Sequence, residues 1–396
     1  MNFVFISPNY PDIYWMFCRG LKKYGAKVLA IVDTSYDSLQ KELKEFCDEC
    51  YVVKSFNDYD EMVKALGYYT FKYGKIDWIE SNNEAWLTLD AKLRDDFNVK
   101  TGFSFEKIDE FQSKAAMKKY YAKAGVPTAR YYLVEDLDGA LKFAKEVGYP
   151  LVLKPDHGVG ASFTYKCLNE DDLKNAYQET TQYHMILEEF VNGDVFTLDG
   201  VCDKNSDIQY LNSMIYVGNC MDSVNNAQAI GTYTALKISD SDKDIIKRTI
   251  KAFELKNRFF HAEFFRLKED KEGLGKRGDV LGLEINFRPP GGICPDMMNY
   301  ASDIDVFDIW AKVLLTEDAG EIPEKKYCCG FAGRRNAEHY KYTVEEITSE
   351  FKDEILYVKY LDAALAAGMG DVLIVGRWSS EERTMEFYNK ALETID

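Results

Sequence analysis

The first 100 residues of the chain alternate between short apolar runs and amphipathic stretches. The apolar runs have the length of buried strands and lie at residues 3–6, 27–32, 50–53 and 78–80. The stretches between them carry apolar residues at helical spacing and predict helices at 13–24, 36–46 and 59–73. This alternation is typical of a doubly wound parallel sheet, an α/β fold that binds ligands at the carboxyl ends of its strands. Those ends carry residues 7–10, Asp33 and residues 80–84.

The rest of the chain mixes helices and strands less regularly, which indicates α/β followed by α+β units. Strands are predicted at 131–134, 151–155, 185–191, 195–202 and 209–217, and helices at 105–125, 137–147, 170–183 and 241–254. Residues 222–231 are polar and predict a mobile loop beside a site. After residue 323, strands at 327–334, 355–360 and 371–376 with helices at 343–351 and 380–394 predict a small α+β lobe. We interpret Arg334 and Arg335 in this lobe as a solvated basic corner, and the alternative is that they reach a substrate pocket.

Two alternating segments, 259–267 and 280–287, predict a β-hairpin, because a charged stretch with three glycines separates them. Side chains two apart on a strand share a face, so Glu284 and Asn286 project together, and the partner strand can bring Glu263 to the same side. Two carboxylates and an amide oxygen suit Mg²⁺. Arg288 continues this face and can pair with a phosphate or a carboxylate. The alternative is the solvated face of a surface hairpin.

A second piece of candidate chemistry is Lys154, which a strand delivers directly before a glycine-rich turn at 156–162. Glycines let backbone amides approach a phosphate closely, and the lysine adds a full charge. The alternative is an ordinary hairpin turn with a surface lysine. The turn is no Walker A loop, and the first turn of the chain lacks G-x-G-x-x-G, which disfavours a dinucleotide site.

The composition and net charge of the chain exclude some classes of binding partner. The chain has 396 residues, enough for several domains, and a net charge of −17. This charge repels phosphate backbones and anionic lipids, so we expect neither a nucleic acid nor a membrane as partner. No apolar run is long enough to span a bilayer, and the N-terminus predicts a first strand rather than a signal peptide, so we expect a cytoplasmic protein. The nine cysteines, an odd number, favour reduced thiols, and Cys47 and Cys50 form a lone C-x-x-C that we interpret as structural.

Taken in order, five pieces of the chain resemble the ATP-grasp superfamily, in its carboxylate-amine ligase branch. They are the helix with Ser113-Lys114 and residues 124–128 after it, the strand with Lys154, the glycine-rich turn, the segment 186–191 and the metal hairpin. The resemblance covers residues 1–316 and implies four units. These are a pre-ATP-grasp α/β domain (1–104), an ATP-grasp small lobe with a glycine-rich lid (105–190), a large lobe with the Mg²⁺ site (191–322) and a C-terminal α+β lobe (323–396).

The resemblance implies ATP as cofactor and assigns residues to it. Lys114 and Lys154 match nucleotide-binding lysines, and the lid over the triphosphate carries His157, Gly158, Gly160 and Ser162. The hinge that holds adenine matches Glu188, Glu189 and Val191, and Asp194 takes the place of a ribose-binding glutamate.

At the other end of this nucleotide site the resemblance implies a metal centre. Glu263, Glu284 and Asn286 match ligands of Mg²⁺, with Mn²⁺ as an alternative ion. Arg288 matches the arginine that positions the phosphate or acyl phosphate, so Arg288 and Lys154 are the catalytic candidates. We expect His261, two residues before Glu263, to support packing.

The function implied is an ATP-dependent ligase that activates a small carboxylic acid as an acyl phosphate and joins it to an amine. Two alternatives stay open, namely ATP-grasp chemistry on bicarbonate or a hydroxyl, and an inactive nucleotide-binding regulatory protein. The partners implied are the two small substrates, and a homodimer is an expectation at the level of the family.

Overall fold

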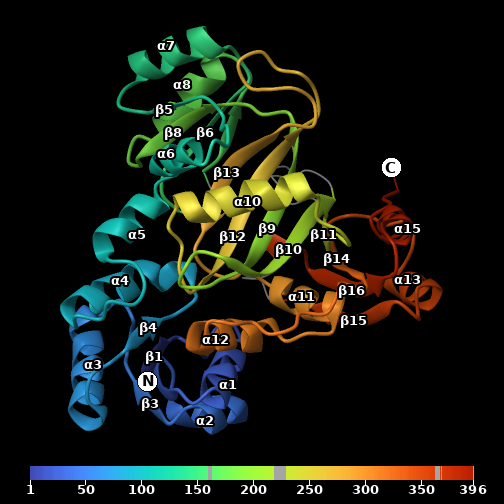
Figure 1. The fold of residues 1–396 in the computed structure, drawn as a ribbon. Coiled ribbons are helices and arrows are strands. Elements are labelled where there is room, and N and C mark those ends of the chain that lie inside the picture. Colours follow the sequence, from blue (N-terminus) through green and yellow to red (C-terminus); the bar gives the residue numbers. More distant parts are fainter. Residues whose placement is uncertain (159–162, 218–228, 362–365, 367, 396) are drawn as a thin grey trace.

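The computed structural model describes all residues except 159–162, 218–228, 362–365, 367 and 396, so the predicted lid residues Gly160 and Ser162 lie outside the described part. The strands and helices form three sheets with their covering helices (Figure 1). The mixed α/β and α+β class expected from the sequence is confirmed. No helix in the described ranges has the length and apolar content needed to cross a bilayer.

The N-terminal sheet has four parallel strands in the order β3-β2-β1-β4. The strands are β1 (Asn2–Ile6), β2 (Lys27–Val32), β3 (Glu49–Val52) and β4 (Trp78–Glu80). The helices are α1 (Trp15–Lys23), α2 (Lys41–Phe46), α3 (Tyr59–Tyr73) and α4 (Leu87–Asp96), with short 3-10 turns at Tyr36–Ser38 and Glu84–Trp86. The predicted parallel sheet is confirmed, and the strand order changes direction between β1 and β4, where such folds open a crevice for ligands.

The long helix predicted at 105–125 is wrong, because the structure contains α5 (Phe105–Gln112) and α6 (Lys114–Lys123). Ser113 between them has an extended backbone, and its hydroxyl accepts a hydrogen bond from the Ala116 amide at 3.1 Å, which caps α6. The carboxylate of Asp156 adds a second cap by accepting from the Ala115 amide at 2.8 Å. The break therefore fixes where α6 begins and how Lys114 is presented.

The second sheet is antiparallel and has the order β5-β8-β6-β7. Its strands are β5 (Tyr131–Leu133), β6 (Leu151–Pro155), β7 (Tyr165–Cys167) and β8 (Met185–Glu189). Helices α7 (Leu137–Val147) and α8 (Glu170–Glu179) cover one face of it (Figure 1). Apolar side chains of β6, β8 and both helices form one small core there, which leaves the other face of β6 and β8 for polar groups.

The third sheet has eight antiparallel strands in the order β13-β12-β9-β10-β11-β14-β16-β15. The strands are β9 (Gly193–Cys202), β10 (Ile208–Val217), β11 (Ile230–Thr234), β12 (Arg258–Leu267), β13 (Val280–Asn286), β14 (Cys328–Arg334), β15 (Ile355–Tyr360) and β16 (Val372–Trp378). The helices of this part are α10 (Asp240–Ala252), α11 (Cys294–Ser302), α12 (Val306–Thr316), α13 (Val344–Glu350) and α15 (Glu381–Ala391). Strands on both sides of residue 322 thus share one sheet.

Three expectations need correction here. Residues 230 and 231 of the predicted mobile loop begin β11, whereas 222–228 lie outside the described residues. Helices α4, α11 and α12 were not predicted. Arg334 and Arg335 are buried rather than solvated, and Arg334 donates to the carbonyl oxygens of Ala391 at 2.7 Å and Tyr342 at 2.8 Å. The eight cysteines that the structure describes are free thiols, as expected.

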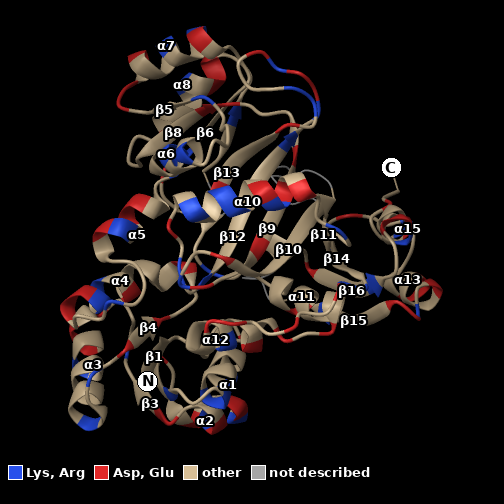
Figure 2. Cartoon of the chain, viewed as in Figure 1, with Lys and Arg blue, Asp and Glu red and all other residues tan. Residues whose placement is uncertain are grey.

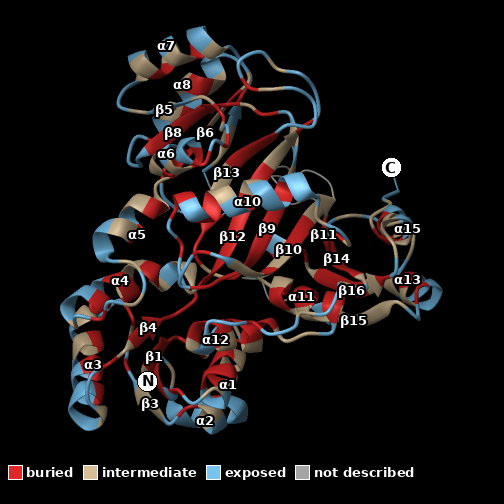
Figure 3. Cartoon of the chain, in the orientation of Figure 1, coloured by how far each residue is buried: buried red, intermediate tan, exposed pale blue. Residues whose placement is uncertain are grey.

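The two faces of the large sheet have different coverings. Helix α10 packs Ile246 and Ile250 onto one face and presents charges of both signs outward (Figures 2 and 3). On the opposite face, apolar residues such as Phe259 join a core with Phe17 of α1 and Trp310 of α12, whose rings lie 5.0 Å apart. We call this opposite face, which carries Glu263, Glu284 and Asn286, the site face. Helices α1 and α12 therefore bring the N-terminal sheet to the site face.

Candidate active site

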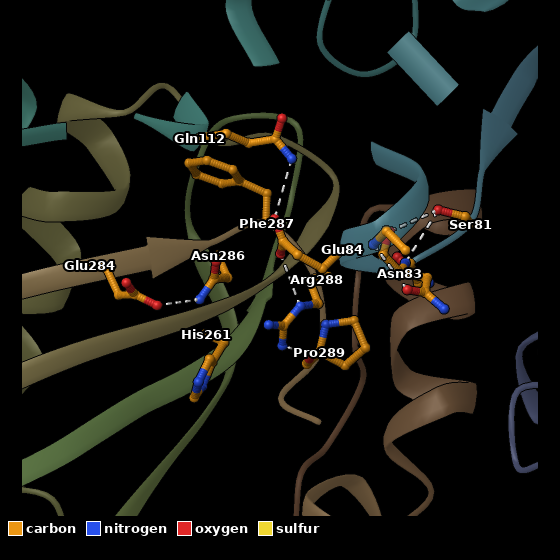
Figure 4. A network of polar contacts seen from close by, with 12 residues as sticks. Ser81, Asn83, Glu84, Gln112, His261, Glu284, Asn286, Phe287, Arg288 and Pro289 are labelled. Carbon is orange, nitrogen blue, oxygen red and sulfur yellow. Dashed lines mark hydrogen bonds and ion pairs between the residues drawn. The ribbon is translucent and has the colours of Figure 1, made fainter. Parts of the chain in front are cut away.

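The β-hairpin predicted to carry the metal site, here called the metal hairpin, forms from β12 and β13. The two strands are antiparallel, Glu263 lies directly opposite Glu284, and His261 lies opposite Asn286. Because cross-strand neighbours share a face, all four side chains project from the site face. Figure 4 shows Glu284, Asn286 and His261 on neighbouring strands, with Arg288 just beyond the end of β13.

The two carboxylates are mostly covered, which does not agree with the solvated face of a surface hairpin. The side chains of Glu263 and Glu284 keep 22% and 18% of their exposure. Burial, and then the charge of Glu263, raise the pKa of Glu284. Burial opposes ionisation of Glu263 too, but the hydrogen bond and charge of His261 lower its pKa. Negative charge is thus concentrated at a partly buried place that favours a cation.

These residues fit a magnesium ion by the chemistry of their donors. Asn286 donates through Nδ2 to Oε1 of Glu284 at 3.2 Å, which leaves its amide oxygen as the ligating atom. Together with Glu263 and Glu284 it offers oxygen atoms only, the set that Mg²⁺ prefers when phosphates and water complete its shell. Within the described ranges no group of three or more His, Cys, Asp or Glu side chains could hold a metal ion, so the set rests on two carboxylates and one amide.

A buried group of charges lies beside the hairpin and contains Lys118, Lys154 and Glu188. Lys118 Nζ lies 2.6 Å from Oε1 of Glu188, and Lys154 Nζ lies 2.7 Å from Oε2. Burial alone would raise the pKa of Glu188, but the charges of Lys154 and Lys118 lower it to about 2. Burial lowers the pKa of Lys118, whereas for Lys154 the charge of Glu188 overcomes burial and raises it. The single carboxylate of Glu188 therefore forms ion pairs with both lysines.

Lys118 was missed in the sequence, although a signal was present. It follows Lys114 by four residues, and residues at that spacing lie on one face of a helix. Lys114 Nζ lies 3.8 Å from Oε2 of Glu284 and donates to the carbonyl oxygen of Gly158 at 2.8 Å. Helix α6 thus presents Lys114 to the hairpin and the start of the glycine-rich turn, and Lys118 to Glu188 of β8.

The described part of the glycine-rich turn is anchored by Asp156. Its backbone oxygen accepts from the Lys114 amide at 3.0 Å, and its carboxylate lies 3.1 Å from Nδ1 of His157. The hydrogen bond with Asp156 raises the pKa of His157, whose side chain is half exposed. The structure brings Gly158 to Lys114, whereas a contact of His157 with phosphate stays a prediction.

The predicted adenine and ribose residues separate into two groups. Glu188 faces the lysines, but Glu189 points to the other side of β8, because neighbouring residues on a strand alternate. There Glu189 pairs with Arg130 at 3.0 and 2.6 Å and lies 3.5 Å from Lys271. Val191 is buried in a small apolar cluster. Asp194 is exposed and pairs with Lys268 at 2.6 Å. The structure does not bring Glu189, Val191 and Asp194 to the lysines, and their roles remain predictions.

Arg288 connects the hairpin with the N-terminal unit. Its Nε donates to Oε2 of Glu84 at 3.0 Å, and its Nη1 donates to the carbonyl oxygen of Pro289 at 2.9 Å (Figure 4). Gln112 donates to the other oxygen of Glu84 at 3.4 Å. Glu84 lies in the segment after β4, at the strand end expected to meet ligands. The crevice of the N-terminal sheet and the metal hairpin therefore meet at this ion pair.

Three kinds of comparison relate the chain to known proteins. The family model described as carbamoyl-phosphate synthase L chain, ATP binding domain, matches residues 109–245. The carbamoyl phosphate synthase large chain of Pyrococcus furiosus is 27% identical over 118 residues, which are 28% of this chain and 11% of that protein. The large chain of Clostridium botulinum is 25% identical over 224 residues, 55% of this chain and 20% of that protein. The chain thus spans a fifth or less of these relatives.

Solved structures resemble the chain over nearly its whole length. The L-amino acid ligase of Bacillus licheniformis has a TM-score of 0.72 at 16% identity and covers 100% of this chain and 98% of its own. The N5-carboxyaminoimidazole synthetase of Staphylococcus aureus has a TM-score of 0.67 at 16% identity, with 99% and 100% covered. A biotin carboxylase domain from Hydrogenobacter thermophilus, in complex with MgADP and bicarbonate, has a TM-score of 0.65 at 18% identity, with 94% and 85% covered.

Proposed function

We propose that this chain, a member of the ATP-grasp superfamily, is an ATP-dependent ligase that joins a small carboxylic acid to an amine. The acid is activated as an acyl phosphate, and ADP and phosphate are released. One structural neighbour is an L-amino acid ligase, so an amino acid is the first candidate for the acid. The observation that carries the proposal is the opposed pair Glu263 and Glu284 with a buried lysine 3.8 Å away.

The reaction has two steps. An oxygen of the acid attacks the γ-phosphorus of ATP, the bond to the β–γ bridging oxygen breaks, and ADP leaves. The nitrogen of the amine then attacks the acyl carbon, phosphate leaves, and the nitrogen gives up a proton. Both steps need positioned charge rather than a side-chain nucleophile.

The residues of the site supply that charge. Lys114, Lys118 and Lys154 would contact the phosphates of ATP, and Glu188 keeps Lys154 protonated because their contact raises the pKa of Lys154. Glu263, Glu284 and Asn286 would hold Mg²⁺, which offsets charge on the β and γ oxygens. Arg288 would exchange Glu84 for the acyl phosphate, because its planar fork suits phosphate oxygens.

The proposal extends to the organisation of the protein. We propose the units 1–104, 105–190, 191–322 and 323–396, of which the last two contribute strands to one sheet. A cytoplasmic location and a homodimer belong to the same proposal. The dimeric biotin carboxylase domain among the structural neighbours supports the second point.

A second candidate function is ATP-dependent activation of bicarbonate. It rests on the biotin carboxylase domain whose structure holds MgADP and bicarbonate and which covers 94% of this chain. A third, an inactive nucleotide-binding regulator, is disfavoured by the intact set of lysines, carboxylates, Asn286 and Arg288.

A screen of acids against amines tests the main proposal. The full-length protein is incubated with ATP and Mg²⁺, and phosphate release is measured for each pair. We expect release that requires both an acid and an amine and that falls at least about a hundredfold in Glu284→Gln, because this change removes a metal-binding charge. Release that needs bicarbonate alone would favour the second candidate.

A further inference from the structure

A series of hydrogen bonds runs from Glu263 of the hairpin to β9 of the same sheet, and its other members, His261, Asp199 and Thr197, have no part in the function proposed above. His261 Nε2 lies 3.1 Å from Oε1 of Glu263, and His261 Nδ1 lies 2.6 Å from Oδ1 of Asp199. The hydroxyl of Thr197 donates to the other oxygen of Asp199 at 2.6 Å. On β9 and β12, Asp199 lies opposite His261 and Thr197 lies opposite Glu263. The register of the two strands therefore fixes the positions of these hydrogen-bonded side chains.

The side chains of Thr197, Asp199 and His261 are fixed in place by burial and hydrogen bonds. Asp199 and Thr197 have no exposed surface, and His261 keeps only 7% of its exposure. Both oxygens of Asp199 are hydrogen-bonded, and both ring nitrogens of His261 have a partner. The imidazole therefore cannot rotate without leaving a buried polar atom unpaired. Sequence reasoning assigned His261 to packing, but its contacts are polar and directed.

The contact with His261 determines which oxygen of Glu263 is free to bind a metal ion. Its Oε1 is committed to His261, whereas Oε2 makes no hydrogen bond or ion pair with any residue that the structure describes. Because the imidazole occupies one lone pair of Oε1, Oε2 is the oxygen with both lone pairs free, and this favours contact with a cation through one oxygen rather than two. Mg²⁺ requires near-octahedral geometry and few protein ligands, whereas Ca²⁺ accepts six to eight oxygens and often takes both oxygens of a carboxylate.

We propose that His261, held by Asp199, is a positioning residue that keeps Glu263 a one-oxygen ligand and thereby makes the site select Mg²⁺ over Ca²⁺. This inference rests on the proposed function, because it requires the metal site. Partners outside the ligand shell commonly orient metal ligands in this way, and their loss changes metal affinity by about 10 to 100-fold.

The test compares metal affinities rather than turnover. Full-length protein saturated with ADP is titrated with Mn²⁺, free Mn²⁺ is followed by electron paramagnetic resonance, and Mg²⁺ and Ca²⁺ are added as competitors. The variant His261→Phe fills the volume of the ring but cannot donate to Glu263. We expect the preference for Mg²⁺ over Ca²⁺ to fall about tenfold, because Glu263 can then present both oxygens.

Two further variants separate positioning from packing. Phe259→Leu disturbs the packing of the same face two residues away, so it should lower the melting temperature and leave the metal preference within twofold of the wild type. Asp199→Asn keeps the shape but weakens the hold on the ring, so it should shift the preference in the direction of His261→Phe by a smaller factor. Asp199→Asn also serves if His261→Phe does not fold.

The outcomes are distinct. A metal preference in His261→Phe and Asp199→Asn that stays within twofold of the wild type overturns the inference and leaves the proposed function standing. If the wild-type protein with ADP binds no Mn²⁺, the metal site itself fails, and both the inference and the proposed function are wrong. A shift toward Ca²⁺ in both variants, but not in Phe259→Leu, supports the inference.

Discussion

Lys118 and Lys154 share the single carboxylate of Glu188, so mutations at the two ends of this group should differ in their effect. In Lys118→Met, Lys154 and Glu188 remain a matched buried pair, and we expect a loss of about 1 kcal/mol in the free energy of unfolding. In Glu188→Gln two buried lysines face each other without a partner, and we expect a loss of about 3 kcal/mol. Urea unfolding measures both values.

Nucleotide affinity should also fall when Lys118 is lost. Lys118→Met removes a cation proposed to meet ATP, and we expect the dissociation constant of ATP to rise about tenfold. Lys123→Met on the same helix is the matched control, because Lys123 is exposed and pairs with Glu254, so both quantities should change little. Equal effects of Lys118→Met and Lys123→Met on ATP binding would contradict a role for Lys118.

A pH dependence is expected from Asp296 in the first turn of α11. Burial raises its pKa from 3.8 to about 6, with a smaller opposing effect of Lys359. The folded protein therefore favours the neutral acid, and the free energy of unfolding falls as pH rises from about 4 to about 6. Asp296→Asn is neutral throughout, so it should be more stable than the wild type by about 2 kcal/mol at pH 7.5 and equally stable at pH 4. Urea unfolding at both pH values measures this difference. If Asp296→Asn stabilises the protein as much at pH 4 as at pH 7.5, the raised pKa of Asp296 is not the cause.

At the scale of elements, the contact between α6 and β13 sets the distance between the lysines and the carboxylates. A Cβ atom on Gly282 of β13 would lie 2.5 Å from the ring of Tyr121 on α6, so no larger side chain fits. We expect Gly282→Ala to push α6 away, to cost about 1–3 kcal/mol of stability and to weaken ATP binding. Calorimetric titration with ATP and urea unfolding check the two effects.

Gly67→Ala in α3 is the control for this prediction. Nothing lies within 4 Å of a Cβ atom at Gly67, and the residue is helical. Alanine should therefore stabilise the helix by up to about 1 kcal/mol and leave ATP affinity unchanged. If Gly282→Ala also leaves ATP affinity unchanged, the spacing between α6 and β13 does not matter for nucleotide binding.

Elements with a local signal were predictable, and those that depend on distant contacts were not. The hairpin of β12 and β13 was visible because alternation and a charged turn lie within the segment itself. The break at Ser113 was not, because Asp156 caps α6 from 41 residues along the chain. Helix α12 (Val306–Thr316) was missed although a signal was present, because its polar residues Asp308, Lys312 and Thr316 recur every four positions, as on one face of a helix.

At the scale of the whole molecule, the site lies where the three sheets meet. The second sheet supplies Lys154 and Glu188, the large sheet supplies the metal hairpin, and the N-terminal unit supplies Glu84. The motifs that contain Lys154 and the metal hairpin could be recognised in the sequence. Arg288 was also predicted, but its pairing with Glu84 joins residues 204 positions apart and has no pattern in the sequence. The same holds for Asp199, which reaches the site only through the register of β9 and β12.

In the proposed function this arrangement activates a carboxylic acid as an acyl phosphate. Hydroxylamine reveals such a step, because it captures an activated acyl group as a hydroxamate. The wild-type protein and Glu284→Gln are incubated with ATP, Mg²⁺, hydroxylamine and a panel of small acids that includes amino acids, and hydroxamate is quantified by mass spectrometry. We expect at least one acid to yield a hydroxamate in an amount equal to the ADP formed, and Glu284→Gln to form neither product. ADP formation with no hydroxamate from any acid, or full activity in Glu284→Gln, would contradict the proposed function.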